Sequence, residues 1–253
     1  MCTTRIRSID SRLGLYSIAY LLAALAWRHG SCQAASVSDE RIRRFERLAR
    51  GGDVAAMGQL LLERLRLGYL SRDRLELAAH LNDPAALAAL GVDPSGEPAD
   101  LREWTCALQR WGRPTVVRAL VAAGRTLQPS RAPAANEALL EVARTWAECP
   151  CTPHAQEAYE ACGHAEQGNP FESSASSVAF HVAHATYVAG FNQGPAGGTS
   201  LQSMVAIVLR VLREGGRSPD EVRRAVQREL AEWALQARAP GTDDAGAPCE
   251  PVW

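Results

Sequence analysis

The chain has 253 residues, of which 47% are hydrophobic and 22% are charged. That is enough chain for one sizeable core or two smaller ones, and enough apolar residues to offset the entropy cost of folding. The formal net charge of −1 argues against a nucleic-acid-binding protein, which normally carries a basic excess. All 27 basic residues are Arg and none is Lys, which we interpret first as GC-rich codon usage.

The N-terminal segment, residues 1–36, has the order of a secretory signal. Arginines come first, an apolar run of 15 residues from Leu13 to Trp27 follows, and small residues lie around Cys32. The run is short for a membrane span, which needs about 20 residues. Two other interpretations stay open. The segment is either a buried helix or upstream sequence translated from a misassigned start, because Val37 directly precedes a good helix opening.

Residues 37–91 predict an N-terminal helical region. Each expected helix follows a residue that can cap its first turn, and apolar residues then recur at helical spacing: the caps are Ser38, Asp53, Ser71 and Asp83. Pro84 fits the first position of a helix, where its missing N–H costs nothing. Residues 92–98 are rich in turn formers and predict a linker.

Residues 99–238 predict a C-terminal helical domain. Helical periodicity covers residues 99–111, 113–127 and 134–148. The segment Leu201–Leu212 is nearly all apolar, so we expect it to be a central helix. Ser218, followed by Pro and two acidic residues, is typical of a helix start. The Gly-, Pro- and Asp-rich residues 239–253 predict a disordered tail.

The expected fold class is all-α, either a multi-helix bundle or an irregular α-solenoid-like array, with no sheet. No strand pattern occurs, and the predicted helices are short and separated by Gly or Asp-Pro stops. No fixed period supports a named repeat. A group of glycines predicts a connection between two of the later helices: Gly190, Gly194, Gly197 and Gly198.

One cluster has the chemistry of a metal site. Four of the six His and three of the seven Cys fall between residues 149 and 184, and zinc prefers thiolate and imidazole ligands, four at a time. Zinc would use Cys149, Cys151 and His154 with one of four further candidates: Cys162, His164, His181 and His184. However, the cysteine spacing is not that of a zinc knuckle, and Cys is common in cores. We therefore expect structural roles and a metal-free protein, with zinc as the alternative.

No catalytic constellation is recognisable in the sequence. It contains no G-x-S-x-G, no phosphate-binding loop, no dinucleotide-binding glycine pattern and no H-E-x-x-H. We predict no enzyme activity, no catalytic or cofactor-binding residue and no cofactor. The seven Cys are odd in number and irregular in spacing, which indicates reduced thiols and a cytoplasmic location. Export or membrane tethering through residues 13–27 is the alternative.

Two of the predicted helices resemble a known family. Residues 138–146 read Ala-Leu-Leu-Glu-Val-Ala-Arg-Thr-Trp, and residues 181–189 are an Ala-rich stretch that begins His-Val-Ala-His. Together they resemble predicted all-helical immunity proteins encoded beside bacterial polymorphic toxins. The N-terminal segments 47–53 and 75–86 are similar to helical proteins of unknown function from GC-rich bacteria. The resemblance implies an all-helical fold and a toxin as partner.

The leading functional hypothesis is a non-catalytic helical module that binds another protein. The resemblance makes a toxin the expected partner and neutralisation of that toxin the expected role. The first alternative is a zinc-binding helical protein or enzyme that uses the cluster between Cys149 and His184. The second is a secreted or membrane-tethered helical protein. Neither nucleic acid nor a membrane is an expected partner, except for a membrane if residues 13–27 act as a signal or anchor.

Overall fold

The computed structural model describes residues 40–94, 96, 100–129, 133–168, 171–191 and 200–236. Across these residues the protein is all-helical and contains no strands, which confirms the expected fold class. The predictions for residues 1–36, for the cap at Ser38 and for the tail 239–253 lie outside the described residues. In the described part of the chain, no helix is both long enough and apolar enough to cross a membrane.

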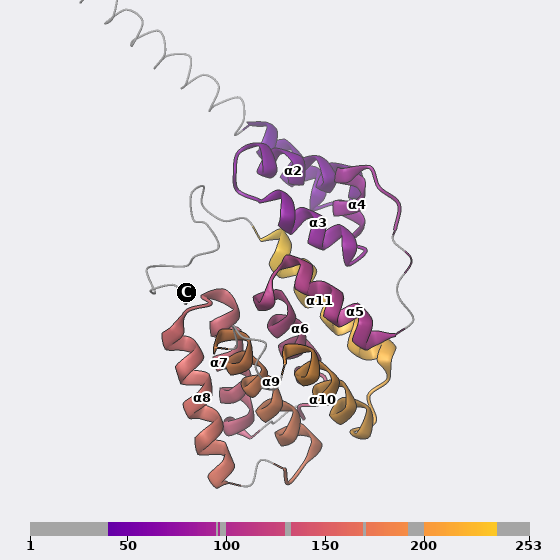
Figure 1. The fold of residues 1–253 in the computed structure, drawn as a ribbon. Coiled ribbons are helices and arrows are strands. Elements are labelled where there is room, and N and C mark those ends of the chain that lie inside the picture. The colour runs from indigo at the N-terminus through magenta and orange to yellow at the C-terminus, as the bar shows by residue number, and fades with distance from the viewer. Residues whose placement is uncertain are drawn as a thin grey trace, which may run out of the picture.

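Three of the N-terminal helices begin where the sequence predicts. Residues 40–49 are helical, and they are followed by α2 (Val54–Arg66), α3 (Arg72–His80) and α4 (Pro84–Leu90). The side chain of Asp53 accepts hydrogen bonds from two backbone amides of α2, and Ser71 and Asp83 cap α3 and α4 in the same way. These caps satisfy amides that have no partner inside the helix. In Figure 1, α2 and α3 both pack against α4.

Eight helical elements follow, and most of their bounds match the sequence periodicity. They are α5 (Leu101–Ala107), the short 3₁₀ helix η1 (Leu108–Trp111), α6 (Arg113–Arg125), α7 (Ala134–Glu148), α8 (Thr152–Gln167), α9 (Ser174–Phe191), α10 (Leu201–Glu214) and α11 (Pro219–Leu235).

The central helix of this part is α9, not α10 as the sequence suggested. Helix α9 packs against α6, α7, α8 and α10 (Figure 1). It carries no Arg, Asp or Glu, and small residues fill much of its surface. Helix α10 buries only one face, because Arg210 and Arg213 stand on the opposite side in contact with solvent. The apolar run therefore overstated how much of α10 is covered.

The predicted connection at Gly190 is also wrong in one respect. Gly190 is buried inside the last turn of α9, and the other three glycines of that group lie outside the described residues. A Cβ at Gly190 would lie 2.5 Å from the Cβ of Ala155 in α8. The glycine is therefore a packing residue that lets α8 and α9 approach each other closely.

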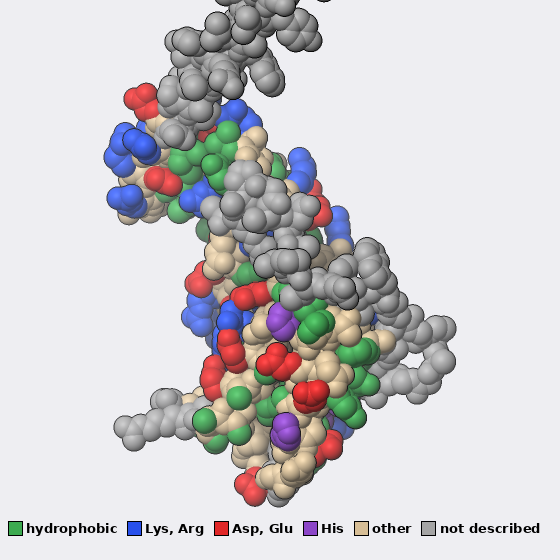
Figure 2. All heavy atoms as spheres, turned by 90° about the vertical axis from the view of Figure 1, so that its left-hand side faces the viewer, with side chains coloured by type: hydrophobic (Ala, Val, Ile, Leu, Met, Phe, Trp, Pro, Cys, Tyr) green, Lys and Arg blue, Asp and Glu red, His purple; other side chains and the backbone are tan. Residues whose placement is uncertain are grey.

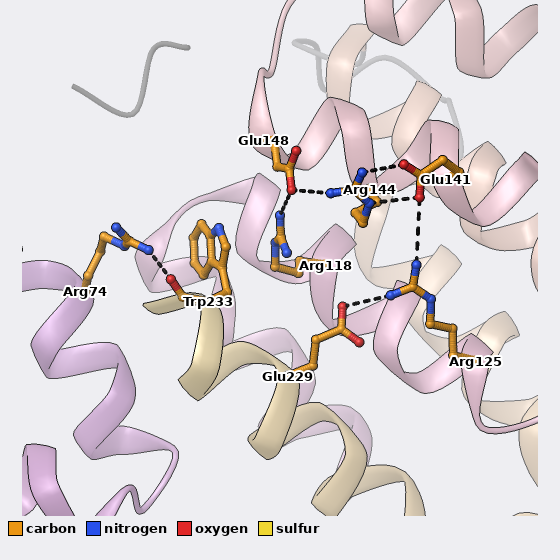
Figure 3. Close-up of polar contacts among 8 residues, drawn as sticks. All are labelled: Arg74, Arg118, Arg125, Glu141, Arg144, Glu148, Glu229 and Trp233. Carbon is orange, nitrogen blue, oxygen red and sulfur yellow. Dashed lines mark hydrogen bonds and ion pairs between the residues drawn. The ribbon is translucent and has the colours of Figure 1, made fainter. Parts of the chain in front are cut away.

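Ion pairs join α6, α7 and α11 (Figure 3). Arg118 of α6 is buried and donates to Glu148 of α7 at 3.0 Å, and Arg144 of α7 pairs with the same carboxylate. Arg125 of α6 reaches Glu229 of α11 at 3.4 Å. These arginines are therefore part of the packing between helices.

The two predicted helical regions share one hydrophobic core. Buried residues from Leu61 in α2 to Leu230 in α11 belong to a single cluster. The contact between the regions runs through α3, which packs on α11 and touches η1 (Figure 1). The sequence-based division into two helical regions at residues 92–98 stays a prediction.

Candidate functional site

Three of the seven predicted metal ligands meet at the junction of α7 and α8. The side-chain ligand atoms of Cys149, Cys151 and His154 all lie within 4.8 Å of one another. Cys149 caps the C-terminus of α7, and Cys151 is the residue just before α8. The amide of Cys151 donates to the carbonyl of Cys149 at 2.8 Å, so a very short turn brings the two cysteines together.

His154 is the centre of this group. Its Nδ1 lies 3.2 Å from Sγ of Cys151 and 3.1 Å from the backbone oxygen of Cys149. Cys151 is buried, and Cys149 and His154 are half-buried. If Nδ1 carries the proton, it donates to the Cys149 carbonyl and braces the turn between the helices. If Nδ1 is unprotonated, its lone pair is available as a ligand.

The donor set fits zinc. Two thiolates and one imidazole are soft or borderline ligands, and no carboxylate is part of the group. Tetrahedral zinc would place a sulfur and a nitrogen ligand about 3.6 Å apart, given Zn–S of about 2.3 Å and Zn–N of about 2.0–2.1 Å. The observed 3.2 Å between Cys151 Sγ and His154 Nδ1 is close to that value. Three protein ligands would leave one coordination position for water or another molecule.

The other four predicted ligands lie elsewhere on α8 and α9. Cys162 is buried with its Sγ 4.0 Å from the carbonyl of Phe180, and burial raises the pKa of its thiol to about 12. A thiol with so high a pKa is a poor metal ligand at neutral pH. His164 is exposed on α8. His181 is half-buried, and burial lowers its pKa.

An aromatic surface on α8 and α9 was not anticipated from the sequence. We call it the α8–α9 aromatic surface and define it by six residues: Tyr159, Phe171, Phe180, His184, Tyr187 and Phe191. The rings form a continuous chain of contacts with centroid separations of 4.9–6.1 Å. Three of the six are large exposed hydrophobic residues: Tyr159, Phe171 and Phe191.

The sequence does contain a signal for this surface. Phe180, His184, Tyr187 and Phe191 recur at intervals of four, three and four residues, which places them on one side of α9. Tyr159 reaches the row from α8, with its ring 4.9 Å from that of Tyr187. A shallow hollow of about 100 Å³ lies between them and is lined by His184 and Cys162 as well.

The charge around this surface is one-sided. Helix α8 carries three exposed glutamates, Glu157, Glu160 and Glu166, and no Arg or Lys. Helix α9 carries no Asp, Glu, Arg or Lys. Figure 2 looks onto α7 and α8 and shows acidic side chains on this face with hydrophobic ones beside them. The aromatic surface therefore has an acidic margin along α8.

The described residues form no arrangement of a nucleophile, a base and an orienting partner like that of a hydrolase. The closest pair is Cys151 and His154, in which the thiol is buried. Two features of the described residues are candidates for binding: the group of Cys149, Cys151 and His154 for a metal, and the α8–α9 aromatic surface for a partner. Comparison of the chain with protein-family models, with curated proteins and with solved structures gave no match.

Proposed function

We propose that this protein is a non-catalytic binding module that docks a basic protein partner on the α8–α9 aromatic surface. The observation that carries the proposal is the row of six touching rings. Tyr159 and Phe171 at its edge are 52% and 58% exposed. Aromatic side chains are enriched at protein interfaces because they bury a large area and lose little rotamer entropy.

The acidic margin along α8 defines the partner's charge. Three glutamates with no Arg or Lys on the same helix favour a partner surface rich in Arg or Lys. Complementary charge speeds association and excludes acidic proteins. A stable complex needs roughly 1,000 Å² or more of buried surface in total. The partner must therefore extend from the aromatic row onto neighbouring parts of α8 and α9. The family resemblance of the sequence suggests that this partner is a toxin encoded next to the protein.

Co-expression with the product of the adjacent gene tests the proposal. We expect a complex that survives purification and a partner that is toxic when expressed alone. The double variant Tyr159→Ala/Phe171→Ala should weaken the complex by at least about thirtyfold, the effect of losing a residue worth about 2 kcal/mol at an interface. The matched control is Leu48→Ala/Val54→Ala, which removes two exposed apolar side chains outside the surface.

Three results would count against the proposal. A neighbour that is not toxic removes the toxin as partner, and failure to form any complex removes the docking role. If the control variant weakens the complex as much as the aromatic variant does, the partner binds near the N-terminal helices instead.

A second candidate function is metal binding at the α7–α8 junction, favoured by the meeting of Cys149, Cys151 and His154. A bound zinc ion would join two helices and, through its remaining position, could polarise a water or a substrate oxygen. The test is elemental analysis of protein purified under reducing conditions. One equivalent of zinc that is lost in Cys151→Ser and kept in Cys106→Ser supports this candidate. Protein that takes up no zinc under these conditions excludes it.

A further inference from the structure

A second cavity lies away from both candidate sites, between α5, α10 and the start of α11. Its volume is about 510 Å³, which is within the range of about 300–1,000 Å³ typical of small-molecule sites. Leu101, Leu209 and Val222 form part of its apolar lining. Asp100 is the one carboxylate residue that lines it, against four cations: Arg102, Arg210, Arg213 and Arg217.

Most of these arginines are available to a ligand. Within the described part of the chain, Arg102 and Arg213 form no ion pair. Arg210 lies 3.8 Å from Glu214, but both side chains are about 60% exposed, so the pair contributes little.

Arg217 has a donor that the protein leaves unused. Its Nη1 donates to Glu221 at 2.7 Å. Its Nε is buried and has no hydrogen-bond acceptor among the described residues. A buried donor without an acceptor costs free energy, and the Arg217 side chain that carries it is one of those lining the cavity.

We propose that this cavity binds an amphipathic organic anion, one with an apolar body and a single carboxylate or phosphate head group. The apolar body would lie against Leu101, Leu209 and Val222. The head group would lie among the arginines, whose planar guanidinium groups bind carboxylate and phosphate oxygens in pairs. A flat basic surface would suit nucleic acid. This cavity differs from such a surface because it combines an apolar lining with two arginines, Arg102 and Arg213, that form no ion pair within the described part of the chain.

The test uses octanoate as the probe, with acetate as its head group alone and octanol as its chain alone. In calorimetric titrations of the full chain, octanoate should bind at least about tenfold more tightly than either fragment, a difference of about 1.4 kcal/mol. Octyl phosphate should bind like octanoate. Octanol binding as tightly as octanoate, or no binding of either anion, would overturn the proposal.

Two variants locate the site. Arg102→Gln/Arg213→Gln should weaken octanoate binding by about tenfold or more, and Ala206→Phe should weaken it by filling the apolar part without changing charge. The matched control, Arg224→Gln/Arg228→Gln, removes two exposed arginines of α11 that do not line the cavity and should leave binding unchanged. Circular dichroism checks that each variant is folded.

A final arm distinguishes a free anion from a lipid head group. Vesicles of phosphatidylcholine with phosphatidylglycerol present the phosphate, but the acyl chains stay in the bilayer and cannot enter the cavity. We expect octanoate to bind and the vesicles not to. Two results would overturn the assignment to this cavity. One is vesicle binding that persists in Ala206→Phe. The other is a control variant that weakens octanoate binding as much as Arg102→Gln/Arg213→Gln does.

Discussion

Arg74 of α3 lies over the indole ring of Trp233 in α11, with its Cζ 5.0 Å from the ring centroid. The same guanidinium donates a hydrogen bond to the backbone carbonyl of Trp233 (Figure 3) and another to that of Gln236. Arg118 of α6 also lies over this ring, with its Cζ 4.9 Å from the centroid. Trp233 is therefore one of the residues through which the N-terminal helices contact the rest of the protein.

The first prediction concerns this join. Arg74→Gln should destabilise the protein by about 2–3 kcal/mol, because the change removes a buried charged donor that bonds two partly buried carbonyls and lies over the Trp233 ring. Arg72→Gln is the matched control on the same helix. The Arg72 side chain is 68% exposed and, among the described residues, pairs only with Glu76, so we expect a change of at most about 0.5 kcal/mol. Urea denaturation followed by circular dichroism measures both, and equal effects would show that the contact with Trp233 contributes nothing.

The second prediction concerns the close approach of α8 and α9. Gly190→Ala should cost about 1–3 kcal/mol, because the new Cβ would lie 2.5 Å from the Cβ of Ala155 and the helices would have to move apart. Gly163→Ala on the exposed side of α8 meets no atom within 4 Å. That control should stabilise the protein by up to about 1 kcal/mol, since Ala has the higher helix propensity. Thermal unfolding distinguishes the two, and a stable Gly190→Ala protein would contradict the packing described above.

Local signals in the sequence were sufficient to predict most of the helices. Asp53, Ser71, Asp83 and Ser218 each accept a hydrogen bond from the first turn that they were expected to cap. Capping involves residues two or three apart, so the sequence carries the whole interaction. How deeply a helix is buried, by contrast, depends on residues that are far away in the sequence. Helix α9 is central because α6, α7, α8 and α10 surround it, and none of those contacts is local.

The candidate metal group was predictable in part for the same reason. Cys149, Cys151 and His154 lie close together in the sequence, at the end of α7 and the start of α8, so their spacing can be read directly from it. Whether His164 or Cys162 could be a further ligand depends on how α8 is rotated about its axis. The Cys162 thiol is buried against Phe180, so it does not face the other three ligands. The contact between Tyr159 of α8 and Tyr187 of α9 could not be predicted in this way, because it joins two helices that are brought together only by the fold.

The third prediction concerns acidic pH. Burial lowers the pKa of His181, and the nearby His184 and Arg210 lower it further. The unfolded chain therefore binds more protons than the folded protein below the usual histidine pKa of about 6.5. The stability contributed by neutral His181 is fully present above that pH and is lost as the pH falls below it.

His181→Phe keeps a ring against Phe171 and Phe180 and removes the titration. Its free energy of unfolding should fall less between about pH 7 and pH 5 than that of the unmodified protein. His80, whose pKa is also lowered by burial, stays in both proteins and contributes equally. A His181→Phe protein with an unaltered pH profile would assign the acid sensitivity to other groups.

The last prediction concerns which residues hold a metal, if the second candidate function is correct. Cys151→Ser and His154→Ala should each lower zinc affinity by at least about a hundredfold, because loss of a direct ligand should exceed the 10–100-fold typical of outer-shell changes. Cys162→Ser should leave the affinity unchanged. The Cys162 thiol is buried beside the Phe180 carbonyl, and its pKa of about 12 keeps it protonated. Competition with a chromophoric zinc chelator measures all three variants. If Cys162→Ser reduced affinity as much as Cys151→Ser, α8 would have to rotate on metal binding, and the group at the helix junction would be only half of the site.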